Sequence, residues 1–395
     1  MKEIAISNGL KDKNIFIVNT CAVTKEAERQ ARQKIRRIRR FNPSSNIIVT
    51  GCSSELHPNY YNKIDYADHI IPNRDKLNPS TWINIANFLN KNSIDIASIP
   101  KAVRENTTEK KYRSFVEVQN GCNHSCTFCV IPQARGINRS IKSKDIIIAI
   151  KKELELGSKE ITLTGVNLTS WGQDFKSPQK FSYLVETILK KIPDLTRLRL
   201  SSLDISEIDD KLINLFQKYK NLLPHIHFSL QSHDDLILKR MKRRHSTQQA
   251  ELIINKFRKI RSDIAIGADF IVGFPTETDK MFENTFNSIR RLGLTHAHVF
   301  AYSERPNTPA SRMPKVPKKV IKERSSLLRK EIKAFQAQQL NKYVGKFEKV
   351  LVQSDSGYGL NEHYFPTYIP GSKEGKIVNC MIISKEKNYL IAKEI

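Results

Sequence analysis

The sequence lacks several features that mark whole classes of protein. No segment joins a basic start to an apolar run, and no apolar stretch approaches the roughly 20 residues that a membrane-spanning helix needs. The 395 residues include only 6 cysteines, three of them in one short segment. This usage does not fit a disulfide framework. We therefore expect a cytoplasmic protein, without a membrane partner, whose cysteines bind metal.

Acidic residues are also scarce: the sequence has 40 acidic and 66 basic residues, which gives a net charge of +26. Such an excess favours nucleic acid as a partner. The alternative is that many lysines of this Lys-, Ile- and Asn-rich chain are simply solvated. Hydrophobic residues make up 39% and charged residues 27%, which is ordinary for a folded protein. The length allows two or three domains.

The N-terminal part, residues 1–100, alternates β-like and helical patterns. The β-like runs cover residues 15–20, 46–51 and 67–72, and the longest helical stretch covers residues 24–40. This alternation predicts a small parallel α/β domain. Residues 101–111 are polar and charged without apolar periodicity, so we predict a linker there.

Residues 108–338 show six β-like runs, each followed by a helical pattern. The runs cover residues 114–119, 160–164, 197–201, 226–230, 264–272 and 296–301. Six such units predict an α/β fold with a partial (β/α)6 parallel barrel. In such barrels the working residues lie on the loops that follow the strands.

The C-terminal part, residues 340–395, follows a strongly basic helical stretch over residues 318–342. Short alternating segments cover residues 349–353, 376–383 and 388–392. Because Gly and Pro turns separate these segments, we predict a small all-β barrel.

The most informative motif is Gly121-Cys122-Asn123-His124-Ser125-Cys126-Thr127-Phe128-Cys129. It places three thiols at C-x3-C-x2-C spacing on the loop after the first predicted barrel strand. Three thiolates bind three corners of a four-iron cluster and leave the fourth iron open. A structural zinc is the alternative, and it needs a fourth ligand from His124 or from a distant residue.

This motif resembles the signature of the radical S-adenosylmethionine (SAM) enzymes. The resemblance implies that Cys122, Cys126 and Cys129 hold a [4Fe-4S] cluster whose open iron is chelated by SAM. It also implies that Phe128 lies near the adenine, and that cluster-driven cleavage of SAM gives a 5′-deoxyadenosyl radical.

Further motifs resemble one family within that superfamily, the methylthiotransferases. They are Asn19-Thr20-Cys21, Thr50-Gly51-Cys52, residues 120–136, residues 163–167, residues 229–232 and residues 271–275. The resemblance implies a methylthiotransferase N-terminal domain, a radical SAM core and an RNA-gripping TRAM barrel. We predict that Thr164, Gly165, Asn167, Ser202 and Gln231, together with Phe128, bind the cofactor.

Cys21 and Cys52 each follow a predicted parallel strand, so both should emerge at one edge of the small sheet. Taken alone, two such cysteines are more often buried core residues than ligands. The resemblance implies instead an auxiliary [4Fe-4S] cluster that carries the transferred sulfur. The family usually has a third cysteine on an earlier loop, and none precedes Cys21 here. The N-terminal domain is therefore expected to be shortened, by truncation, a misassigned start or gene decay, or another ligand replaces the thiolate.

Cys380 and His124 are expected to have structural roles. We expect Cys380, on an alternating strand, to be a core residue. We expect His124 to stabilise its loop rather than to bind metal.

The family's substrates are adenosine beside the anticodon carrying an isopentenyl or a threonylcarbamoyl group, or an aspartate of a ribosomal protein. Residues 164–172 and 199–202 most resemble the threonylcarbamoyl branch. The implied partners are a transfer RNA anticodon stem-loop and an electron donor such as a flavodoxin or ferredoxin. An inactive RNA-binding remnant and a zinc-stabilised binding protein remain alternatives. Candidate phosphate contacts are Arg29, Arg32, Arg36, Arg37, Arg39, Arg40, Lys239, Arg240, Lys242, Arg243, Arg244 and the basic residues of 315–333.

Overall fold

The computed structural model describes residues 1–10, 14–62, 67–91 and 112–395. The chain divides into two compact units. The N-terminal unit comprises Met1–Glu109, Cys129–Ile137 and Ser303–Arg305, and the C-terminal unit comprises Lys110–Phe128, Asn138–Tyr302 and Pro306–Ile395. The predicted linker over residues 101–111 lies outside the described residues.

The N-terminal unit is built on a parallel sheet. Its strand order is β1-β2-β3, with β1 at Ile15–Thr20, β2 at Asn46–Gly51 and β3 at His69–Ile70. Helix α2 (Lys25–Phe41) begins at Thr24, whose side chain accepts a hydrogen bond from the N–H of Ala27. The buried Ile35 of this helix packs against Val18 of β1. The predicted parallel α/β arrangement is confirmed, with a third strand of only two residues.

Short helices complete this unit. They are α1 (Lys2–Ala5), η1 (Ile6–Leu10), α3 (Cys52–Leu56), α4 (Pro58–Asn62), α5 (Pro79–Lys91) and α6 (Ile131–Arg135). Trp82 of α5 is fully buried and anchors a hydrophobic cluster with Ile48 and Ile71.

In the described residues of the C-terminal unit, six parallel strands and one short antiparallel strand form the two sheets of a partial barrel. One sheet has the order β5-β4-β6-β7 and the other β10-β9-β8. The strands are β4 (Arg113–Asn120), β5 (Arg139–Ser140), β6 (Glu160–Gly165), β7 (Leu198–Leu200), β8 (His225–Gln231), β9 (Ala265–Val272) and β10 (Leu294–Ala301). Parallel bridges Leu198–Leu222 and Leu203–Phe228 join the two sheets. The predicted partial barrel is confirmed, and β5 is a short antiparallel addition to β4.

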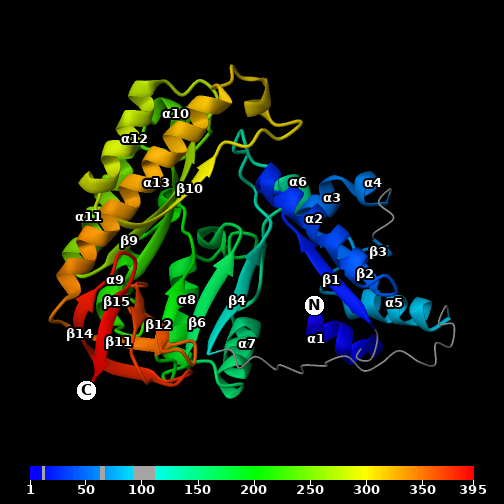
Figure 1. Cartoon of the computed structure of the whole chain (residues 1–395), viewed down its shortest axis with the longest axis horizontal. Helices are drawn as coiled ribbons and strands as arrows, with labels where there is room; N and C mark the ends of the chain where they lie inside the picture. Colours follow the sequence, from blue (N-terminus) through cyan, green and yellow to red (C-terminus); the bar gives the residue numbers. More distant parts are fainter. Residues whose placement is uncertain (11–13, 63–66, 92–111) are drawn as a thin grey trace. The chain divides into compact units, whose positions relative to one another are not determined.

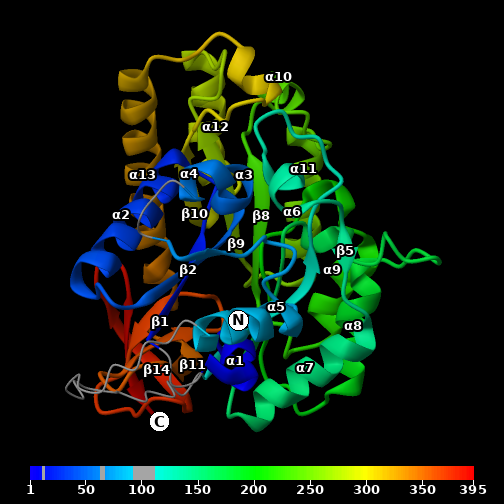
Figure 2. The ribbon, with the colours of Figure 1, turned by 90° about the vertical axis from the view of Figure 1, so that its right-hand side faces the viewer.

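Helices cover the outside of these strands. They are α7 (Ser143–Glu155), α8 (Phe181–Lys191), α9 (Asp210–Lys218), α10 (Asp235–Arg240), α11 (Thr247–Ile260), α12 (Asp279–Arg291) and α13 (Lys318–Leu340). Figure 1 shows α11, α12 and α13 along one side of β9 and β10. In Figure 2, α7, α8 and α9 line the side of this unit opposite α13. Among the described residues, no helix combines the length and the apolar character that crossing a membrane requires.

The chain ends in a closed five-stranded barrel with the order β11-β12-β13-β15-β14. The strands are β11 (Phe347–Val352), β12 (Tyr358–Asn361), β13 (Pro366–Tyr368), β14 (Ile377–Lys385) and β15 (Leu390–Glu394). The predicted small β-barrel is confirmed. The sequence pattern had not indicated β12 and β13, because three or four residues are too short to show an alternation.

A buried ion cluster joins this small barrel to the amino-terminal ends of β6 and β7. Glu160, fully buried, pairs with Arg113, Arg197 and Arg199. The guanidinium groups of Arg197 and Arg199 both also donate to the backbone carbonyl oxygen of Asn361. Burial on its own raises the pKa of Glu160, but Arg199, Arg197 and Arg113 outweigh it and lower the pKa to about 2. The small barrel is thus fixed at the end opposite the cysteine loop (Figure 1).

Candidate functional site

The cysteine loop begins at Gly121, directly after β4. Gly121 has a φ of +73°, a conformation that glycine adopts without strain. Cys122 and Cys126 are half-buried free thiols. The Cys122 sulfur accepts a hydrogen bond from the N–H of His124 at 3.4 Å, and Arg243 Nη1 donates to the Cys126 sulfur at 3.7 Å. Each sulfur therefore accepts a hydrogen bond, although at Cys122 burial outweighs the hydrogen bond and raises the pKa of the thiol.

The same local arrangement recurs at two other predicted ligands. The sulfur of Cys129 accepts the N–H of Ile131, and that of Cys21 accepts the N–H of Val23, each at 3.4 Å. Hydrogen bonds of this kind to cluster-bound sulfurs tune iron–sulfur sites. Since all predicted ligands are cysteine thiols, the donor set fits iron–sulfur ligation.

His124 is engaged elsewhere in the loop. Its Nε2 lies 3.3 Å from Oε1 of Glu207 and 3.5 Å from the side-chain nitrogen of Asn167. This pairing agrees with a loop-stabilising role for His124.

Glu207, at the end of η3 (Ile205–Glu207), is the main site residue that sequence reasoning missed. Its carboxylate accepts hydrogen bonds from Asn167, Thr169 and Ser170 and pairs with His124 and Arg244. Burial on its own raises the pKa of Glu207, but the hydrogen bonds from His124 and Arg244 hold it well below its usual range. An ionised carboxylate thus holds two loops together. A lone Glu after a short strand gave no motif by which to find it.

Gln119, near the end of β4, links the same loops from the other side. Its Oε1 accepts the backbone N–H groups of Val166 and Asn167, each at 2.9 Å. Its Nε2 donates to the carbonyl oxygen of Gly121 at 2.7 Å and to Oδ1 of Asn138 at 2.6 Å. Gln119 is fully buried, so it fixes the start of the cysteine loop against the loop after β6.

The structure places the predicted cofactor residues at the carboxyl ends of the strands. Thr164 and Gly165 end β6, and Gln231 ends β8 with a φ of +67°. The rings of Phe128 and Phe274 pack edge to face with centroids 6.4 Å apart. In barrels of parallel strands, ligands bind at the carboxyl ends of the strands. The assignment of these residues to SAM stays a prediction.

Ser202 and Asn167, also predicted to bind the cofactor, lie in two separate hydrogen-bond groups. Asn167 belongs to the group around Glu207. The hydroxyl of Ser202 instead contacts Ser229 at 2.7 Å and donates to Oδ2 of Asp269 at 3.0 Å. The structure therefore brings Ser202 to β8 and β9 rather than to the cysteine loop.

Cys21 and Cys52 follow the paired strands β1 and β2, whose last residues Thr20 and Gly51 are in register. Cys21 is exposed and Cys52 is buried. Arg135 Nε donates to the Cys52 sulfur at 3.1 Å, and Asn73 Nδ2 lies 3.8 Å from it. The two thiols thus leave the same edge of the sheet, as expected from the parallel topology. Their service as cluster ligands stays a prediction.

Cys380 lies in the core of the C-terminal barrel, where the alternating pattern put it. It is fully buried among Val350, Phe365 and Leu390. Burial raises the pKa of its thiol to about 11. An inert core cysteine has these properties.

Comparison with known families and sequences assigns the chain. Residues 116–289 match the Radical SAM superfamily, and residues 1–72 match uncharacterized protein family UPF0004. The chain is 40% identical to the threonylcarbamoyladenosine tRNA methylthiotransferase MtaB of Rickettsia prowazekii, over 95% of this chain and 90% of that protein. It is 33% identical to the protein of the same name from Thermotoga maritima, over 95% and 88%. A tRNA-2-methylthio-N(6)-dimethylallyladenosine synthase of Bacillus subtilis is 31% identical, over 95% and 77%.

Solved structures agree at the level of the fold. The radical SAM methyltransferase TsrM of Kitasatospora setae superposes with a TM-score of 0.56 and 14% identity, over 78% of this chain and 66% of that one. The cobalamin-dependent radical SAM enzyme OxsB gives 0.50 and 13%, over 84% and 49%. Together with the cysteine motif that follows β4, these relationships show that the chain belongs to the radical SAM methylthiotransferases, a family of iron–sulfur transferases.

Proposed function

We propose that this enzyme adds a methylthio group to C2 of N6-threonylcarbamoyladenosine next to the anticodon of transfer RNA. The observation that carries the proposal is the 40% identity, over 90% of its length, to a relative named for that reaction. Residues 164–172 resemble the same branch, and they include Asn167, which donates a hydrogen bond to Glu207. The reaction would take place in the cytoplasm with a flavodoxin or ferredoxin as electron donor.

The cysteine loop supplies the first part of the chemistry. Cys122, Cys126 and Cys129 would hold a [4Fe-4S] cluster, which supplies the electron that cleaves SAM when both are bound. The chain's own contribution is to orient and to shield. Glu207 and Gln119 fix the loop, while Phe128 and Phe274 provide an apolar surface beside it.

Cys21 and Cys52 would hold the auxiliary cluster that donates sulfur. Arg135, which contacts the Cys52 sulfur, would stabilise the negative charge of a bound cluster. The sequence holds no other cysteine before Cys122.

The basic residues predicted to contact RNA fall into two groups. Arg243 and Arg244 pair with the buried Asp204, and Arg324 is buried against Glu277, so these guanidinium groups are engaged by carboxylates of the chain itself. The exposed set includes Arg36, Arg37 and Arg40 of α2 together with Lys239 and Lys242. These exposed cations support phosphate contacts to an anticodon stem-loop.

The test is methylthiolation by the anaerobically reconstituted full chain with SAM, sulfide and a reductant. Stem-loops carry threonylcarbamoyladenosine, isopentenyladenosine or unmodified adenosine, and nucleosides are read by mass spectrometry. We expect product from the threonylcarbamoyl substrate only, and the same product with a Cys380→Ala control. Product from the isopentenyl substrate alone would transfer the assignment to the branch of the Bacillus subtilis synthase. Cleavage of SAM without any methylthiolated nucleoside would contradict the proposal.

A further inference from the structure

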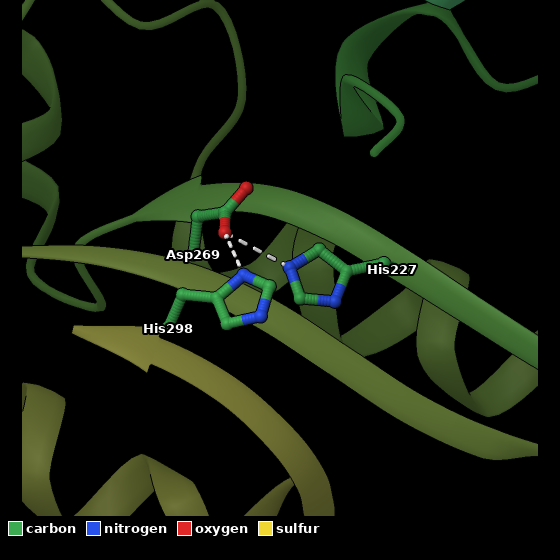
Figure 3. Close-up of side chains that lie close together, drawn as sticks. All are labelled: His227, Asp269 and His298. Carbon is green, nitrogen blue, oxygen red and sulfur yellow. Dashed lines mark hydrogen bonds and ion pairs between the residues drawn. The ribbon is translucent and has the colours of Figure 1, made fainter. Parts of the chain in front are cut away.

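Three side chains inside the C-terminal unit form a compact group that the proposed reaction does not use. They are His227 of β8, Asp269 of β9 and His298 of β10 (Figure 3). The three strands are neighbours in the order β10-β9-β8. Asp269 and His298 are register partners, and His227 pairs with Gly267, two residues before Asp269 on β9. All three side chains therefore lie on the same face of one sheet.

The distances between these side chains are short. His227 Nε2 and His298 Nδ1 each lie 3.0 Å from the same oxygen, Oδ1 of Asp269. One donor atom from each residue lies within 4.8 Å of the other two. Figure 3 shows both rings turned toward the carboxylate from opposite neighbouring strands. Two imidazole nitrogens and a carboxylate oxygen thus converge on one point.

The surroundings orient these groups. Ser202 donates its hydroxyl proton to Oδ2 of Asp269 at 3.0 Å, which leaves Oδ1 directed at the two histidines. A Cβ at Gly267 would lie 2.3 Å from Nδ1 of His227. The absence of a side chain there therefore makes room for the ring. In metal sites, hydrogen bonds from neighbouring groups fix the orientation of the residues that bind the ion, as Ser202 does here for Asp269.

The three side chains differ in solvent exposure, and the group that they form is open on the side of His298. The side chains of His227 and Asp269 are 10% and 17% exposed, whereas that of His298 is 66% exposed. The site is thus buried on the side of His227 and Asp269 and accessible on the side of His298, as an ion with open coordination positions requires.

We propose that His227, Asp269 and His298 bind a divalent transition-metal ion such as Zn²⁺ or Co²⁺. The donor set of two imidazole nitrogens and one carboxylate oxygen suits these ions and not Mg²⁺ or Ca²⁺. The remaining positions of the ion face His298's open side and take water or an oxygen-bearing ligand. The site needs no cysteine, so it is independent of both iron–sulfur sites and goes beyond the proposed function.

The experiment uses the reconstituted full chain, so that the cysteines hold their clusters, and Zn²⁺ as the probe. Zinc per chain is measured after gel filtration, and X-ray absorption at the zinc edge identifies the donors. We expect about one zinc per chain with nitrogen and oxygen donors. The variant with Cys122, Cys126 and Cys129 replaced by Ala should bind zinc at the same site.

Variants separate the site from incidental binding. Asp269→Asn and His227→Gln remove a ligand and should weaken zinc binding by more than about a hundredfold, whereas Ser202→Ala should weaken it by about tenfold. His233→Gln is the matched control, because His233 also pairs with a carboxylate, Glu251, but has no second imidazole there. Iron content and circular dichroism establish that each variant is folded.

The contradicting results are specific. Sulfur donors in the absorption spectrum, no zinc on the parent chain, or equal zinc on the parent and on folded Asp269→Asn would each overturn the proposal. None of these results depends on methylthiolation, so failure of the metal site and failure of the proposed function are distinguishable.

Discussion

Two buried glutamates at opposite ends of the same barrel provide an instructive comparison. Glu160, at the amino end of β6, pairs with three arginines whose guanidinium groups reach the C-terminal β-barrel. Glu207, beyond the carboxyl end of β7, pairs with His124 and Arg244 and accepts hydrogen bonds from a polar loop. Both are carboxylates whose pKa is lowered by their basic partners although burial opposes this.

The difference lies in what each carboxylate holds. The partners of Glu160 are arginines anchored on strands, so its loss leaves buried charges without compensation. The partners of Glu207 include a partly exposed arginine and the cysteine loop itself. The barrel thus uses the same chemistry for stability at one end and for positioning at the other.

The largest expected effect is at Glu160. Glu160→Gln leaves Arg113, Arg197 and Arg199 without their carboxylate and should lower the free energy of unfolding by about 3–5 kcal/mol, measured by urea denaturation. Glu186 is the matched control, because it also pairs with three cations, Lys190, Lys211 and Lys218, whose side chains are about half exposed. Glu186→Gln should cost less than about 1 kcal/mol. An equal loss of unfolding free energy in the two variants would contradict the special role of the buried Glu160.

The pH dependence should follow from the same carboxylate. Because the pKa of Glu160 is lowered to about 2 in the folded protein, its stabilisation is present above the ordinary pKa and is lost as the pH falls toward 2. The parent should lose about 3 kcal/mol from this group. The stability difference between the parent and Glu160→Gln should therefore shrink between pH 6 and pH 3. A constant difference over that range would contradict the ion-cluster assignment.

Glu207 should show a smaller effect on stability and a larger one on the site. Glu207→Gln weakens the hydrogen bonds that residue 207 accepts from Thr169 and Ser170. The free energy of unfolding should fall by about 1–3 kcal/mol. We expect cleavage of SAM to fall by roughly tenfold or more, since the cysteine loop loses its support. Glu160→Gln, compared at a temperature where both variants are folded, should keep that activity. The opposite ranking would mean that Glu207 is architectural.

The smallest effect is expected at His124. His124→Gln removes the contact to Glu207 and should cost about 1 kcal/mol. Iron per chain should stay unchanged, because the cysteines remain. A loss of iron in this variant would instead make His124 a ligand.

Much of the architecture could be predicted, because it follows from local patterns. The β-like run over residues 160–164 and the helical stretch over residues 24–40 match β6 and α2 within one or two residues. Cys122, Cys126 and Cys129 lie within eight residues of the sequence, so their spacing alone indicated the chemistry.

Other features could not be predicted, because they depend on residues that meet only in the folded chain. Glu207 and His124 are 83 positions apart in a sequence without a motif that links them. The same holds for His227, Asp269 and His298, which three separate strands bring together. Arg135 was part of a quoted motif, but its contact with Cys52 appears only in the structure.

We propose that the chain holds two separate iron–sulfur sites, and iron and labile sulfide content with electron paramagnetic resonance tests this proposal most directly. We expect about eight irons per chain in the anaerobically reconstituted parent and in Cys380→Ala, and about four after Cys122, Cys126 and Cys129 are all replaced by Ala. About four irons in the parent and none in the triple variant would contradict the claim, because Cys21 and Cys52 would then hold no cluster.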